Sequence, residues 1–245
     1  MKYAIISDIH SNLESLKFFL KILSKLQIEK IICLGDIVGY NANPNECIQI
    51  ISNFNNLEII RGNHDRAVTK NDYYYFSQDA KNAIKWTIKN INQSSFEFLN
   101  SLTKGPKIID NEFAICHGSA TDEDNYLFMP FHTKKDFFWL KKNNIKILFF
   151  GHTHYQCIFC MDKKKNVEIL MNRSLILDPD CSYLINPGSI GQPRDNDPRA
   201  SFAIFDSDKM QINIIRYHYP FKQTQLKIIN NDLPQFLAER LAYGY

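Results

Sequence analysis

The sequence predicts an α/β protein with two β-sheets rather than one. Over the first two-thirds of the 245 residues, short apolar and β-branched runs alternate with amphipathic helical stretches. After residue 155 the pattern changes to strand-like runs joined by turn residues. Alternating strands and helices followed by a strand-rich part are typical of such a fold. Because no internal repeat, low-complexity tract or linker interrupts the chain, we expect a single domain over residues 1–245.

The alternating part begins with a strand at residues 3–6, which are apolar and partly β-branched. An apolar stripe at helical spacing follows and predicts a helix over residues 13–23. Pro44 suits the first turn of the next helix, where its missing N–H would have no partner anyway. Further strands are expected at 31–34, 57–60, 107–109, 113–116 and 145–150, and further helices at 44–51, 78–91 and 134–142.

The strand-rich part is predicted to contain strands at 156–161, 167–170, 201–205 and 212–216. Cys157 and Cys160 form a Cys-x-x-Cys pattern that could be a metal or redox pair. The chain has no second pattern of this kind, and positions three apart on a strand face opposite ways. We therefore expect both cysteines to be structural.

Composition argues against two classes of partner. Hydrophobic residues make up 44% of the chain, enough for a sizeable core, and the formal net charge is only +3. So small a charge gives no electrostatic footprint for a nucleic-acid polymer or an anionic membrane. The apolar stretches are as long as buried strands, and Ser7 and Asp8 interrupt the first one. We expect a soluble, cytoplasmic protein and leave its oligomeric state open.

Five predicted strands run directly into loops rich in metal-ligand residues. The carboxyl ends of strands in open α/β sheets meet at one edge, so these loops can converge. The loops, in chain order, are Asp8-Ile9-His10, Gly35-Asp36, Gly62-Asn63-His64-Asp65, His117-Gly118 and Gly151-His152-Thr153-His154.

The residue types in these loops favour a particular kind of metal site. Carboxylate, amide and imidazole groups without a thiolate suit Mn, Fe or Zn rather than a cysteine-rich structural zinc. Seven candidate ligands are too many for one ion with open positions, so they predict two metal ions with one bridging carboxylate. The candidates are Asp8, His10, Asp36, Asn63, His117, His152 and His154. Each short motif alone could be an ordinary structural feature, such as a turn or a buried histidine. The prediction therefore depends on the occurrence of all five motifs in this order.

This ordered set resembles the signature of the calcineurin-like metallophosphoesterases. The resemblance implies a four-layer, two-sheet β-sandwich flanked by helices and a phosphoesterase with two divalent metal ions, Mn being favoured. It also implies a role for each candidate. Asp8, His10 and His154 would hold one ion, Asn63, His117 and His152 would hold the other, and Asp36 would bridge them. His64 would be catalytic, stabilising the transition state or protonating the leaving oxygen.

Departures from the family pattern narrow the expected substrate. Protein phosphatases and symmetric dinucleotide tetraphosphatases carry an Asp-Arg pair soon after the Gly-Asp motif, whereas Asp36 is followed by residues 37–41 without arginine. The tract 186–195 resembles a loop of small prokaryotic phosphodiesterases, some of which cleave dinucleotide polyphosphates. Within it Arg194 could contact phosphate or simply be structural.

A loop over residues 121–132 follows the His117 motif and offers further substrate contacts. Tyr126, Phe128 and His132 lie in this loop, and its aromatic rings could stack on a base or simply fold it onto the core. The expected substrate is a small phosphodiester, phosphoanhydride or nucleotide. A phosphomonoesterase or protein phosphatase is the alternative enzyme. A non-catalytic scaffold is the alternative of another class, and the complete ligand set argues against it.

Overall fold

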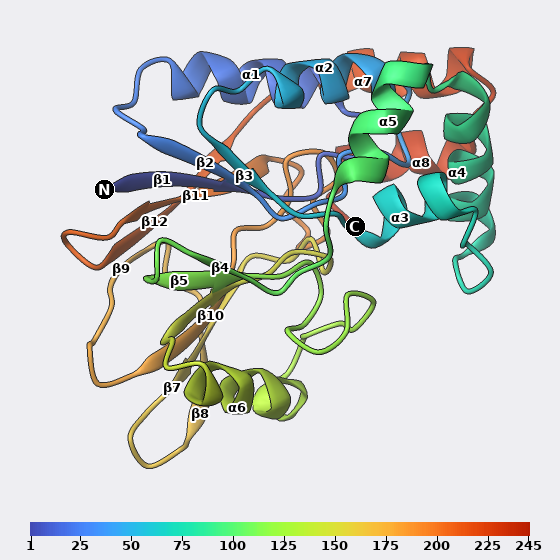
Figure 1. Ribbon diagram of the computed structural model, residues 1–245. Coiled ribbons are helices and arrows are strands. Elements are labelled where there is room, and N and C mark those ends of the chain that lie inside the picture. The colour runs from blue at the N-terminus through green and yellow to red at the C-terminus, as the bar shows by residue number, and fades with distance from the viewer.

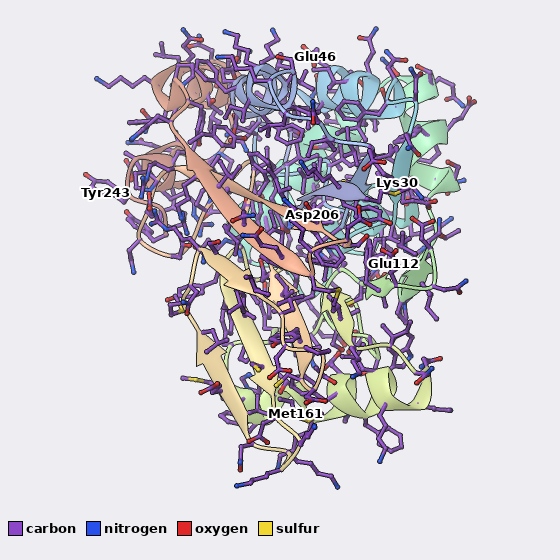
Figure 2. The ribbon with its side chains drawn as sticks, turned by 90° about the vertical axis from the view of Figure 1, so that its left-hand side faces the viewer. Lys30, Glu46, Glu112, Met161, Asp206 and Tyr243 are labelled. Atoms are coloured by element: carbon purple, nitrogen blue, oxygen red, sulfur yellow. The ribbon has the colours of Figure 1, made fainter.

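The computed structural model describes residues 1–245 and contains two six-stranded sheets that pack face to face. Helices cover the outer face of each sheet, so the molecule has four layers (Figure 1). In Figure 2, Glu46 lies on the helical layer at one end of this stack, and Met161 lies near the other end of the stack. The predicted fold class, two mixed sheets flanked by helices, is confirmed.

The first sheet mixes parallel and antiparallel strands. β1 (Lys2–Ile6) pairs in parallel with β2 (Lys30–Cys33), and β2 pairs in parallel with β3 (Leu57–Ile59). On its other side β1 pairs antiparallel with a strand from the end of the chain. The order is β3-β2-β1-β11-β12-β9, where the last three are β11 (Ala200–Asp206), β12 (Gln211–Tyr217) and β9 (Ser174–Ile176).

The second sheet has the same mixed character. Its central strands β5 (Phe113–Ile115), β6 (Ile147–Phe149) and β10 (Ser182–Asn186) are parallel. The order is β4-β5-β6-β10-β7-β8, where the flanking strands are β4 (Lys107–Ile109), β7 (Cys157–Met161) and β8 (Val167–Leu170).

An apolar core fills the space between the sheets. Alternate residues of each strand point inward, as a two-residue side-chain period requires. Tyr3 and Phe205 from one sheet meet Phe113 from the other, with the Tyr3 and Phe113 ring centroids 5.0 Å apart. Cys157 belongs to the outer cluster of the second sheet and Cys160 to this inner core. The two side chains therefore lie on opposite faces of β7, as predicted. Both thiols are buried and free.

Helices of the first half cover the outer face of the first sheet. In α1 (Leu13–Leu23) the N-terminal cap is Asn12, whose side chain accepts a hydrogen bond from the Ser15 N–H. The other helices of this layer are α2 (Pro44–Ser52), α3 (Asn63–Lys70), α4 (Gln78–Asn90) and α5 (Gln93–Ser101). On the second sheet, α6 (Lys134–Lys142) follows a short 3-10 turn, η1 (Pro130–Thr133).

The chain ends in a helical segment that sequence reasoning did not predict. It comprises α7 (Phe221–Asn230), α8 (Gln235–Glu239) and the 3-10 turn η2 (Arg240–Ala242). Their buried residues pack with those of α4 in a separate small cluster. α7 buries only Thr224 and Ile228, so its apolar stripe is too sparse to be recognised. α3, α5, β9 and β10 were also not predicted, and α3 buries polar residues of the Asn63 motif in place of an apolar stripe.

Candidate metal centre

The ligand-rich loops converge at one edge of the sandwich. β1, β2 and β3 are parallel in one sheet, and β5 and β6 are parallel in the other, so their carboxyl ends supply these loops. Asp8 and His10 follow β1, and Asp36 follows β2. Asn63 opens α3 directly after the β3 loop. All seven predicted metal ligands are buried here.

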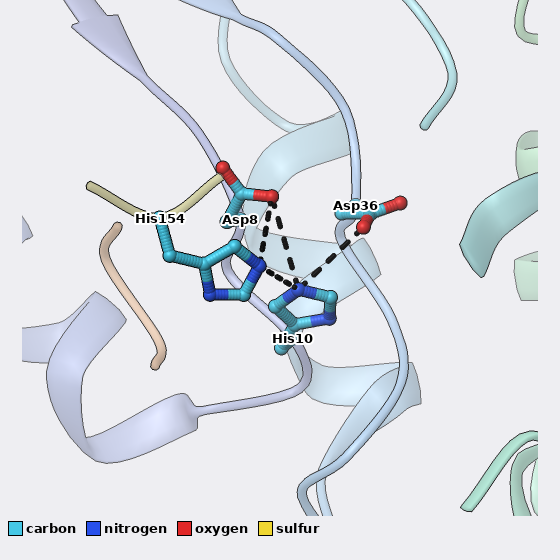
Figure 3. Close-up of side chains that lie close together, drawn as sticks. All are labelled: Asp8, His10, Asp36 and His154. Carbon is cyan, nitrogen blue, oxygen red and sulfur yellow. Dashed lines mark hydrogen bonds and ion pairs between the residues drawn. The ribbon is translucent and has the colours of Figure 1, made fainter. Parts of the chain in front are cut away.

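Four of these residues form a first group (Figure 3). The Nε2 atoms of His10 and His154 are 3.0 Å apart. Asp8 Oδ1 lies 3.3 Å from His154 Nε2 and 3.8 Å from His10 Nε2. Asp36 Oδ2 lies 3.5 Å from His10 Nε2. One ligand atom from each residue falls within 4.8 Å of the others, close enough to hold a metal ion.

Asp36 also belongs to a second group, with His117 and His152. Its Oδ2 lies 3.3 Å from His117 Nε2, which in turn lies 3.0 Å from Asn63 Oδ1. The same carboxylate oxygen therefore faces His10 on one side and His117 on the other. A carboxylate between two ligand groups is the arrangement that a two-metal site requires.

Backbone carbonyl groups orient the histidine rings. Nδ1 of His10, His117 and His154 lies 2.9, 2.9 and 2.6 Å from the carbonyl oxygens of Val38, Leu34 and Gln192. A ring that donates its Nδ1–H in this way has a free lone pair on Nε2 for a metal. The His152 ring has the opposite orientation, since its Nε2 rather than its Nδ1 lies 3.2 Å from a backbone carbonyl oxygen, that of Asp124. Its remaining nitrogen, Nδ1, is the one that could bind.

The carboxylates fit a cation as well. Asp8 Oδ1 and Asp36 Oδ2 are buried and accept no hydrogen bond from the protein. A buried carboxylate oxygen without a partner is costly unless a cation compensates it. Burial opposes ionisation of Asp36, but the nearby histidines outweigh it and hold the pKa of its carboxyl well below the usual range. The donor set therefore fits a divalent cation, with imidazole and carboxylate ligands and no thiolate.

The backbone of the ligand loops is held in a conformation that few residues adopt. Asp8, His10, Asp36, His152 and His154 all have positive φ, between 47° and 65°. Asp and His tolerate the left-handed region better than most residues. The conformation still costs free energy, and residues that adopt it cluster at functional sites. The surrounding contacts must therefore impose it.

Asp65 supplies those contacts between two of the loops. Its carboxylate accepts hydrogen bonds from the N–H groups of Gly62, Asp36, Ile37 and Val38, at 2.8 to 3.3 Å. A Cβ at position 62 would lie 2.0 Å from Asp36 Oδ1, so only glycine allows this approach. The Gly62-Asn63-His64-Asp65 motif does not reveal a role for Asp65 from sequence alone, and the structure shows that it fixes the loop carrying Asp36.

A cavity of about 630 Å³ opens over the ligand groups. Of the predicted substrate contacts, Tyr126 and Arg194 line it, whereas Phe128 and His132 do not. His132 Nδ1 instead accepts hydrogen bonds from the N–H groups of Phe128 and Met129, and so shapes its own loop. His64 lines the cavity too. Tyr40 and Arg240 are among the further lining residues that sequence reasoning missed.

His64 packs among aromatic rings beside the first ligand group. Its ring centroid is 4.5 Å from that of Tyr40, 4.8 Å from that of His10 and 4.9 Å from that of Phe76. Its Nδ1 has no hydrogen-bond partner. Burial lowers the pKa of His64 to about 4, so the ring is neutral at neutral pH.

Comparison with known families decides the affiliation. The model of the calcineurin-like phosphoesterase superfamily domain matches residues 1–210. The chain belongs to this superfamily. Its members depend on divalent metals, in agreement with the two ligand groups. The predicted family is thereby confirmed, and membership of it implies a phosphoester hydrolase.

Individual proteins similar to this chain cover it almost completely. An uncharacterized protein of Methanocaldococcus jannaschii is 41% identical over 98% of this chain and 97% of its own length. A metallophosphoesterase from Sphaerobacter thermophilus is 32% identical, with a TM-score of 0.84 over 100% of this chain and 99% of the other. A hypothetical protein from Pyrococcus horikoshii is 21% identical, with a TM-score of 0.83 over 100% of this chain and 98% of the other. The two proteins therefore share the fold. No helix of this superfamily member is long and apolar enough to cross a membrane.

Proposed function

We propose that the protein is a two-metal phosphoesterase that hydrolyses a phosphodiester or phosphoanhydride of a small molecule or nucleotide. The observation that supports this most strongly is the position of Asp36, which is shared by both ligand groups. When bound, two divalent ions lower the pKa of a shared water and stabilise charge on the phosphoryl oxygens. Asp8, His10 and His154 would hold one ion, and Asn63, His117 and His152 the other.

The protein's own residues would orient the substrate and balance charge. His64 is neutral at neutral pH, which favours donation of a hydrogen bond to the developing charge over proton transfer from an imidazolium. Tyr126 stacks on His152, with ring centroids 4.0 Å apart and an interplanar angle of 27°. The Tyr126 side chain is partly exposed and lines the cavity, so the exposed part of its ring could contact a base. We do not extend this role to Phe128 or His132, which lie outside the cavity lining.

Manganese is the metal that we favour. Carboxylate, amide and imidazole ligands without thiolate suit it, although the general affinity order places zinc above it. The ion present after purification will therefore reflect supply as well as selectivity.

The test is a metal-exchange assay. Protein stripped with chelator and reloaded with Mn²⁺, Zn²⁺ or Mg²⁺ would be assayed on bis(p-nitrophenyl) phosphate and on p-nitrophenyl phosphate. We expect activity only after reloading, highest with Mn²⁺ and greater on the diester. Preference for the monoester would support the phosphomonoesterase alternative. Two bound metals without hydrolysis of either ester, or of any nucleotide in a screen, would support the scaffold.

A further inference from the structure

Two arginines at the cavity differ from every other arginine of the chain in having no Asp or Glu side chain as an ion-pair partner. The sequence contains seven arginines. Five form salt bridges with Asp or Glu side chains, namely Arg61, Arg66, Arg173, Arg199 and Arg216. Arg194 and Arg240 have no such carboxylate within 4.0 Å, and both line the cavity over the ligand groups. Positive charge without an acidic side chain beside it is therefore concentrated at the candidate site.

Arg194 stands next to the ligand groups. Its backbone N–H donates to the carbonyl oxygen of His154 at 3.2 Å. Its Nε and Nη2 both donate to Gln192 Oε1, at 3.2 and 2.8 Å, and its Cζ lies 5.5 Å from the Tyr40 ring centroid. These contacts fix the guanidinium in place beside Tyr40, with no acidic side chain paired to it.

Arg240 reaches the same cavity from the end of the chain. It begins η2, beyond residue 210 where the match to the superfamily domain ends. Its Nε donates to the backbone oxygen of Tyr245, and its Cζ lies 5.3 Å from the Phe236 ring centroid. Leu237 and Leu241 anchor the segment in the cluster that contains Tyr40. Both Nη groups remain without a protein partner.

The two guanidinium groups line the same cavity, where the charge of one influences the other. Burial and then the charge of Arg194 lower the pKa of Arg240 to about 10, so it stays protonated at neutral pH. The Asn196 N–H donates to the Gly244 carbonyl oxygen at 2.8 Å, which ties the terminal segment to the loop of Arg194. Two like charges held together in a partly buried place are unfavourable unless an anion lies between them.

Arg66, the third arginine of the cavity, shows the contrast. It contacts Glu123 and Asp124 at 2.5 and 2.9 Å and Asp72 at 3.1 Å, so its charge is compensated. The cavity arginines without an acidic side-chain partner are thus Arg194 and Arg240.

We propose that Arg194 and Arg240 form a second anion-binding subsite, which holds a non-reacting phosphoryl group of the substrate beside the one that is hydrolysed. This proposal rests on the proposed function and narrows its substrate class to compounds with at least two phosphoryl groups. Guanidinium groups match phosphate oxygens in geometry and charge, and the Nη groups of Arg240 are free to donate to them. A substrate with a single phosphoryl group would leave Arg240 unused.

The test compares ligands that differ by one phosphoryl group. AMP and ADP share the base and sugar, so stacking on Tyr126 cancels from the comparison. Both would compete with bis(p-nitrophenyl) phosphate on the Mn²⁺-loaded enzyme at constant free Mn²⁺. We expect ADP to inhibit at least about tenfold more tightly than AMP, the effect of a hydrogen bond between charged groups. Arg240→Gln should abolish that advantage while AMP inhibition changes less than about twofold, and Arg240→Lys should retain part of it.

Arg173→Gln is the matched control, since it removes an exposed arginine outside the cavity and should leave the ADP advantage intact. Calorimetric binding of AMP and ADP to the Mn²⁺-loaded protein needs no turnover. Failure of hydrolysis would therefore contradict the proposed function without removing this test. Equal affinity of the wild-type protein for AMP and ADP would overturn the subsite. An Arg240→Gln variant that keeps the ADP advantage would overturn the subsite too, whether or not its Tm is lowered. If its Tm is lowered while the advantage remains, Arg240 only anchors the terminal segment.

Discussion

His64 shows how a residue next to a metal ligand can have a separate task. Its neighbour Asn63 faces His117, whereas its own ring lies against His10 and Tyr40 and borders the cavity. A neutral imidazole in that place can donate a hydrogen bond to a phosphoryl or leaving oxygen without giving up a metal ligand.

Replacing His64 should therefore separate catalysis from metal binding. We expect His64→Asn to lower kcat by about 10²- to 10⁴-fold, the usual effect of losing a positioned acid or donor. Metal content should remain that of the wild-type protein, and esters with a leaving group of low pKa should recover part of the rate. The checks are steady-state kinetics on a series of aryl esters and elemental analysis. Loss of metal from this variant would show that His64 is a ligand.

At the scale of elements, the loop between β5 and α6 contributes one wall of the cavity. Within it, the rings of Tyr126 and Phe128 stack with centroids 5.5 Å apart and planes nearly parallel at 5°. Leu127 between them is fully buried and fixes the loop on the second sheet. The loop therefore combines a structural anchor with an aromatic surface at the candidate site.

The role of this aromatic surface can be tested with a pair of substrates. We expect Tyr126→Ala to raise KM for a nucleotide substrate by about 5- to 150-fold, because base stacking on an aromatic ring contributes about 1–3 kcal/mol. Hydrolysis of bis(p-nitrophenyl) phosphate should change much less. Phe131→Ala is the matched control, since Phe131 is an exposed ring of the same loop outside the cavity. An equal loss on both substrates, or a large drop in Tm, would mean that Tyr126 is structural.

The elements that sequence could predict are those whose apolar pattern is dictated by the core. α1 and α6 have the predicted bounds because each presents a stripe to one sheet. The ligand loops could be predicted as a group because each follows a strand that ends at the same edge. Arg240 could not be predicted, because η2 and α8 are short and only tertiary packing brings them to the cavity. Phe128 and His132 share a loop with Tyr126, yet sequence proximity alone does not tell which side chain faces the site.

For the whole molecule, buried histidines with a lowered pKa, such as His64 and His152, couple stability to pH when metal has been removed. Burial lowers the pKa of His64 to about 4 and that of His152 to about 3. In the unfolded chain these groups bind protons below about pH 6.5, so the unfolded state then binds more protons than the folded one. Stability should fall as the pH drops from about 6.5 towards these folded values.

This pH dependence predicts a measurable slope. Each such histidine should weaken the metal-free protein by up to about 1.4 kcal/mol per pH unit over that range. The measurement is the free energy of unfolding after chelator treatment, between pH 7 and pH 4. His64→Asn should flatten the slope, whereas His218→Asn should not, because His218 is exposed. An unchanged slope in His64→Asn would show that His64 is protonated in the folded protein.

The most direct test of a two-metal centre bridged by Asp36 is metal stoichiometry in an Asp36→Asn variant. Asp232→Asn is its matched control, because Asp232 is exposed and has the same φ of 55° as Asp36. Elemental analysis after reloading with Mn²⁺ should find two equivalents in the wild-type protein and in Asp232→Asn. In Asp36→Asn we expect one equivalent or fewer, with activity largely lost, since a neutral amide cannot bridge two dications as a carboxylate does. Two full equivalents in an active Asp36→Asn protein would contradict the account.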